Sequence, residues 1–74
     1  MKKGIVLYYA EPGTLIPTRL IVVECDKSTI KAINSSTMAI DDLPSNLMGK
    51  LLFEFKEDAE RCCIEEAIRD ALAA

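Results

Sequence analysis

Hydrophobic and polar positions along the first 55 residues form the short runs that are typical of β-strands. Runs rich in β-branched and aromatic residues are separated by Pro-Gly, Asp-Lys-Ser and Asn-Ser-Ser stretches, which favour turns. The pattern therefore predicts an antiparallel sheet of four or five short strands. The predicted strands cover residues 4–10, 19–25, 29–33, 37–40 and 50–55.

The end of the chain has a helical pattern instead. Residues 57–72 are rich in Ala, Glu, Arg and Ile, lack Gly and Pro, and begin with acidic residues, which the helix dipole favours. At about 100° per residue, one side of this helix is apolar and suited to packing on a sheet. That side carries Cys63, Ile64, Ala67, Ile68 and Ala71. Residues 1–74 are thus expected to form one α+β domain, a strongly bent antiparallel sheet with a C-terminal helix packed on it.

The order of these elements resembles the layout of an SH3-like small barrel with an added helix. A helical turn is expected before the last strand, with Asp42 as its cap, Pro44 in its first positions and Gly49 at its end. This capping role explains the Asp41-Asp42 pair better than a metal site, because the acid spacing of an EF-hand loop is absent. The resemblance covers the layout of residues 4–55 and includes no motif, so it implies no functional residue.

Both faces of the predicted strands are apolar. Leu20 and Val22 share one face of their strand, and Ile21 and Val23 share the other. One helix cannot cover both faces of such a sheet, so one face either curls inward or becomes an interface. The two phenylalanines, at positions 53 and 55, are expected to anchor the core because each can bury about 150–250 Å².

The charge of the chain is unevenly distributed. The net charge is −3, which disfavours general nucleic-acid binding because that binding depends on neutralising phosphates. Residues 1–40 nevertheless carry five basic against three acidic side chains, whereas residues 41–74 carry four against nine. The basic half keeps a nucleic-acid-associated regulator as the alternative function. Its candidate residues are Lys2, Lys3, Arg19, Lys27 and Lys31.

The chemical groups of the chain do not form a recognisable catalytic or metal site. The sequence has no histidine, three cysteines and no phosphate-binding glycine motif. Cys62 and Cys63 fall on different sides of the predicted helix, so we expect Cys63 in the core and Cys62 facing solvent. Acidic neighbours disfavour a thiolate at Cys62. We therefore predict no catalytic residue, no metal ligand and no cofactor.

These observations favour a small, non-catalytic interaction module. Its apolar runs are too short to span a membrane, and reduced thiols in the cytoplasm are the expected setting. The expected partner is another protein or a second copy of the chain, forming a homodimer; nucleic acid is the alternative. The predicted interaction surface consists of Tyr8, Tyr9, Arg19, Leu20, Val22 and Lys31.

Overall fold

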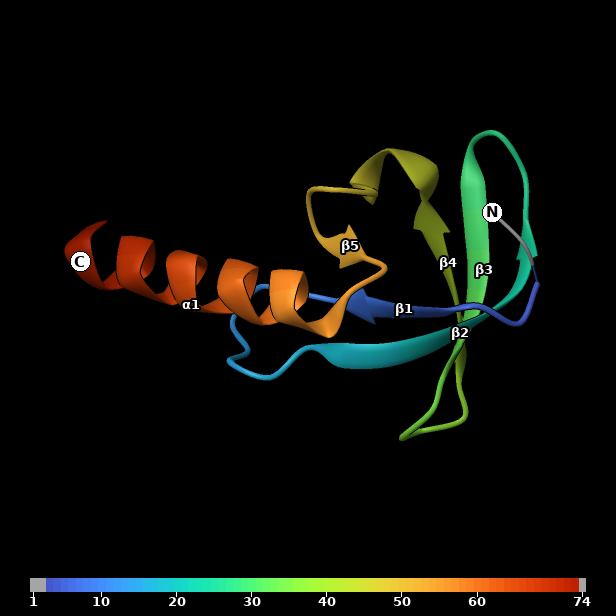
Figure 1. Ribbon diagram of the computed structural model, residues 1–74, viewed down its shortest axis with the longest axis horizontal. Helices are drawn as coiled ribbons and strands as arrows, with labels where there is room; N and C mark the ends of the chain where they lie inside the picture. Colours follow the sequence, from blue (N-terminus) through green and yellow to red (C-terminus); the bar gives the residue numbers. More distant parts are fainter. Residues whose placement is uncertain (1–2, 74) are drawn as a thin grey trace.

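The computed structural model describes residues 3–73, which form one antiparallel sheet and one long helix. The α+β fold expected from the sequence is confirmed, with the helix at the C-terminal end (Figure 1). The elements in chain order are β1 (Val6–Tyr9), β2 (Thr18–Cys25), β3 (Thr29–Asn34), β4 (Ile40–Pro44), the short 3-10 helix η1 (Ser45–Leu47), β5 (Leu52–Phe53) and α1 (Lys56–Ala73).

The sheet is open, with β4 and β5 at its two edges. The strand order is β4-β3-β2-β1-β5, and every neighbouring pair is antiparallel. The sheet is strongly twisted, so that β3 and β4 run steeply across the direction of β1 in Figure 1. Among the described residues no strand pairing joins β4 to β5, so the sheet does not close into the small barrel that the layout resembles.

Side chains that bond to nearby backbone groups hold the β2–β3 and β3–β4 turns, which begin where the sequence predicts them. The carboxylate of Asp26 accepts hydrogen bonds from the backbone N–H groups of Ser28 (2.8 Å) and Thr29 (2.7 Å), which closes the β2–β3 hairpin. These bonds stabilise the charged carboxylate and lower the pKa of Asp26. The side chain of Asn34 performs a similar role after β3, where it accepts from the N–H of Ser36 (2.9 Å).

The strand predicted at residues 37–40 lies further along the chain, at Ile40–Pro44. Met38 has a φ of 63°, and its N–H donates to the carbonyl of Asn34 (2.7 Å), so residues 37–39 complete the turn instead of starting a strand. The prediction that Asp42 caps a helical turn is therefore wrong. Asp41 and Asp42 lie within β4, and Asp42 is placed opposite Lys31, a favourable cross-strand pair.

The core lies on one face of the sheet and is built mostly from aliphatic side chains. Its cluster of buried residues is Leu7, Leu20, Val22, Ile30, Ala32 and Leu52. Leu47 and Met48, from η1 and the residue after it, pack against this cluster. Phe53 is half-buried, and Phe55 has 64% of its surface exposed, so the prediction that both phenylalanines anchor the core is wrong. The predicted strand at 50–55 is reduced to Leu52–Phe53, because Gly49, at a φ of 80°, and its neighbours form a turn.

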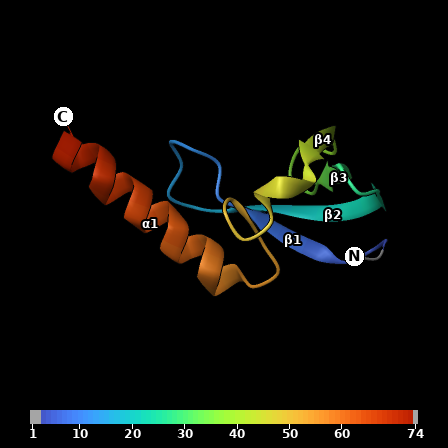
Figure 2. The same ribbon diagram turned by 90° about the horizontal axis from the view of Figure 1, so that it is seen from above.

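Helix α1 packs on β1 and β5 through its N-terminal half and then projects beyond the sheet (Figure 2). Its buried residues are Ala59 and Cys63. Of the apolar side predicted from the sequence, Cys63 is buried and Ala67 is half-buried, whereas Ile64, Ile68 and Ala71 are exposed. The side of the helix that packs on the sheet is therefore narrower than the predicted apolar side, and it is centred on Ala59 and Cys63.

Candidate interaction surface

The predicted interaction surface divides between the two faces of the sheet. Leu20 and Val22 are each 1% exposed and belong to the core, so they cannot contact a partner in the folded chain. Tyr9 also packs against the core. Tyr8, Arg19 and Lys31 lie on the opposite face, because alternate residues of a strand point to opposite sides.

The face opposite the core carries a row of branched aliphatic side chains across four neighbouring strands. The strand register places Val6 beside Ile21, Ile21 beside Ile33, and Ile33 beside Ile40. We call these four residues the aliphatic row. Val6, Ile21 and Ile33 are half-buried, and Ile40 is 60% exposed, whereas the core residues of β1, β2 and β3 are at most 1% exposed. This row supplies the apolar surface that the sequence pattern predicts at Leu20 and Val22.

Two aromatic side chains and an arginine lie on one side of the aliphatic row. Tyr8 is paired with Phe53 on β5 and with Arg19 on β2, so the three residues follow one another across the sheet. Cross-strand aromatic neighbours of this kind stabilise a sheet and also provide flat surface for a partner. Arg19 is exposed and supplies a positive charge at this end of the face.

Charged residues lie on the other side of the aliphatic row. Glu24 pairs with Lys31, and Lys31 pairs with Asp42, so two carboxylates flank one ammonium group. We call this whole surface the open face. It consists of the aliphatic row together with Tyr8, Arg19, Phe53, Glu24, Lys31 and Asp42. It has a basic, aromatic end and an end with a net negative charge.

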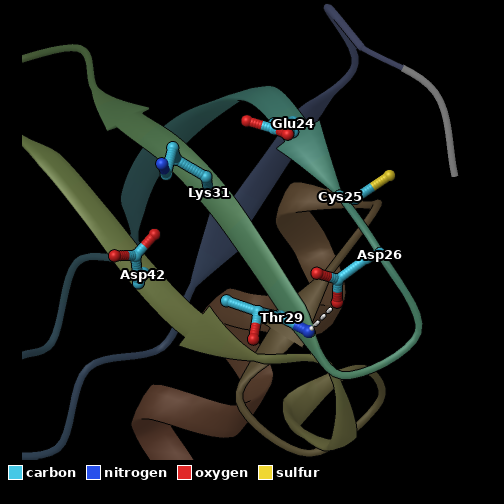
Figure 3. A pocket seen from close by; sticks show the side chains of 6 residues that line it. All are labelled: Glu24, Cys25, Asp26, Thr29, Lys31 and Asp42. Atoms are coloured by element: carbon cyan, nitrogen blue, oxygen red, sulfur yellow. Dashed lines mark hydrogen bonds between the residues drawn. The ribbon is translucent and has the colours of Figure 1, made fainter.

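A shallow depression of about 390 Å³ lies where the open face reaches the β2–β3 hairpin (Figure 3). Glu24, Asp26 and Asp42 bring three carboxylates to it, but Asp26 is bonded to the backbone of its own turn. Figure 3 shows that the side chain of Cys25 points away from Lys31 and Asp42. Within residues 3–73, no group of three or more His, Cys, Asp or Glu side chains is placed to hold a metal ion.

The basic residues of the alternative function are separated along the sheet. Arg19 lies on one side of the aliphatic row, Lys31 lies on the other, and Lys27 is in the hairpin turn between β2 and β3. Lys3 is exposed near the start of β1, and Lys2 lies outside the described residues. The described basic side chains therefore do not form one continuous patch.

The two adjacent cysteines have different surroundings. Cys63 is buried, whereas Cys62 is half-buried and its thiol donates a hydrogen bond to the carbonyl of Lys50 (3.4 Å). Partial burial raises the pKa of the Cys62 thiol, and the negative charges of Glu66 and Glu65 raise it further. Cys62 therefore lacks the lowered pKa that marks a reactive thiolate.

Brief treatment of the native protein with iodoacetamide is expected to label Cys62 well before Cys63. Cys63 can react only when α1 separates from the sheet, whereas Cys62 is partly accessible in the folded state. The labelling rate of Cys62 should still be rising above pH 9, because its thiolate forms at a higher pH than that of an ordinary thiol. Peptide mass spectrometry over a time course measures both rates. Equal rates at the two positions would mean that α1 does not pack as described.

Comparison of the chain with protein-family models, with curated proteins and with solved structures finds no significant match. Within residues 3–73, no helix has the length and apolar character needed to cross a membrane. The candidate site is therefore defined by the geometry of the open face. The sequence pattern did not predict Phe53 and the aliphatic row as part of the interaction surface. Strand alternation shows which residues share a face of the sheet, but it does not show which face packs against the rest of the chain.

Proposed function

We propose that the chain is a non-catalytic interaction module that forms a homodimer through the open face of its sheet. The aliphatic row is the observation that carries this proposal, since four branched aliphatic side chains lie side by side on the face away from the core. Burial of apolar surface is the main favourable contribution to most protein association. Elements of the same chain, η1 and α1, cover other parts of the sheet.

The charges of the open face favour a second copy as the partner. Two sheets packed face to face are related by a two-fold axis that lies between them. If the axis runs along the aliphatic row, the two rows stack, and Arg19 approaches Glu24 of the second copy. If the axis runs along the strands instead, the two Arg19 side chains lie at the same end of the interface, and the two negatively charged ends also lie together. Electrostatic complementarity therefore favours the first arrangement.

Sedimentation of the protein at micromolar concentration is expected to give the mass of a dimer. Replacing Ile33 with Asp should give a monomer, because the dimer would then bury an unpaired carboxylate at its centre. The matched control is Ile68→Asp, the same change at an exposed position of α1, which should leave the mass unchanged. Circular dichroism verifies that each variant is folded. A wild-type monomer would contradict the proposal.

Charge reversal tests the orientation of the dimer without changing its apolar surface. Arg19→Glu and Glu24→Arg should each weaken the dimer by several-fold, and the double variant should recover most of the affinity. Recovery is expected because the pair is restored across the interface with its charges exchanged. Additive weakening in the double variant would contradict the proposed axis.

Single-stranded nucleic acid is a second candidate partner, and the placement of Tyr8 and Phe53 beside Arg19 favours it. Bases stack on neighbouring aromatic side chains of this kind. The aspartate and glutamate side chains of the open face and the separation of its basic residues make this candidate the weaker one. Titration of a fluorescent oligonucleotide at two salt concentrations distinguishes the two. The absence of binding at low salt would eliminate nucleic acid.

A further inference from the structure

Helix α1 has a second apolar surface that its own sheet does not use. Ile64, Ile68 and Leu72 are spaced by four residues and therefore line one side of the helix, which we call the helix stripe. They are 54%, 55% and 82% exposed. At about 100° per residue, the stripe lies on roughly the opposite side of the helix from Ala59 and Cys63, which face the sheet.

The part of α1 that carries the helix stripe extends beyond the sheet. Figures 1 and 2 both show the C-terminal half of the helix projecting away from the strands. In this half, the loop between β1 and β2 lies beside the helix, where Gly13 and Leu15 approach Ala67 and Asp70. Ala67 and Asp70 are on the side of the helix that continues from Cys63, so this loop leaves the stripe exposed.

The helix also carries the net negative charge of the chain. Residues 56–73 contain three basic and six acidic side chains, a net charge of −3, which equals the net charge of all 74 residues. Arg61 forms an ion pair with Asp58, and Arg69 forms one with Glu66. The exposed carboxylates of Glu57, Glu60 and Glu65 lie around the N-terminal end of the stripe and along its borders.

An apolar stripe with acidic borders complements a basic amphipathic helix. We infer that the helix stripe binds a basic amphipathic helix of another protein, with the apolar side of that helix against Ile64, Ile68 and Leu72. Its lysine or arginine side chains then reach Glu57, Glu60 and Glu65. A second copy of α1 would bring two helices of net charge −3 together, which like-charge repulsion opposes. This surface is separate from the open face and does not depend on the proposed homodimer.

The test uses the full chain and an 18-residue model peptide of leucine and lysine whose leucines lie on one side of a helix. In NMR titrations of the ¹⁵N-labelled protein, the peptide should shift the amide signals of residues 57–72. Its affinity should decrease as salt is added, because exposed charges are screened. A peptide with glutamate in place of every lysine is the control and should not bind.

Two variants of equal chemistry show which surface is responsible. Ile68→Gln removes part of the stripe without changing the charge and should weaken binding by about tenfold or more. Ile40→Gln makes the same change on the open face and should bind the peptide with normal affinity. Ile33→Asp should also bind the peptide normally, whether this variant is a monomer or a dimer. Equal binding of the acidic peptide, an equal loss in Ile40→Gln, or self-association through residues 64–72 would overturn the inference.

Discussion

Replacing Leu20 with Ala is expected to lower the free energy of unfolding by about 2–5 kcal/mol. Leu20 is 1% exposed, lies beside Leu7 across β1 and β2, and belongs to the central cluster of the core. The truncation removes its buried methyl groups and leaves a cavity that the sheet cannot fill without moving its strands. A domain of this size has only a few kcal/mol of net stability, so the variant should be largely unfolded at physiological temperature. Urea denaturation followed by circular dichroism measures the change.

Phe55→Ala is the control for this experiment, since it removes a larger side chain from a position that the sequence pattern also assigns to the core. Phe55 is mostly exposed, between β5 and α1, so its loss should change the free energy of unfolding by about 0.5 kcal/mol or less. If Phe55→Ala destabilises the protein as much as Leu20→Ala, the described arrangement of residues 50–56 is wrong.

The second large effect is expected at the contact between the helix and the sheet. Ala59 is fully buried, so Ala59→Leu inserts three additional carbon atoms where no space exists. Overpacking of this kind costs about 1–3 kcal/mol. Since α1 is held to the sheet mainly around Ala59 and Cys63, the added side chain should separate the helix while the central strands stay paired. Amide hydrogen exchange should increase in α1 and change little in β2 and β3.

Ala71→Leu makes the same substitution in the exposed part of the same helix. Leucine and alanine have similar helix propensities, so this control should leave both stability and exchange nearly unchanged. Faster exchange of β2 and β3 in Ala59→Leu, equal to that of α1, would show instead that the helix and the sheet unfold as one unit.

Local signals explain which parts of the fold the sequence predicts well. The carboxylate of Asp26 bonds to amides two and three residues away, so its turn depends on neighbouring residues alone. The acidic first turn of α1 and the absence of Gly and Pro in it are equally local, and the helix runs from Lys56 to Ala73, close to the predicted 57–72. Such features can be recognised without knowing what packs against them.

The parts that the sequence does not predict depend on contacts between distant residues. In β2 both faces are apolar, so the side chains that pack on one face, among them the distant Leu47 and Met48, decide that Leu20 is buried and Ile21 is only half-buried. Asp42 has the local character of a helix cap, but pairing with Lys31 places it in a strand. The open face was predicted only in part. Tyr8, Arg19 and Lys31 lie on it as predicted, but its apolar residue on β2 is Ile21, which lies between the predicted Leu20 and Val22 and points to the opposite face.

Strand β4 forms an edge of the sheet, and its residues affect how the protein can polymerise. Unprotected edge strands add further strands from other molecules and so extend into fibres. Here the edge carries Asp41 and Asp42 and ends at Pro44, which has no N–H to donate. Two such edges brought together would place carboxylate against carboxylate. Growth into an endless ribbon through this edge is thereby discouraged.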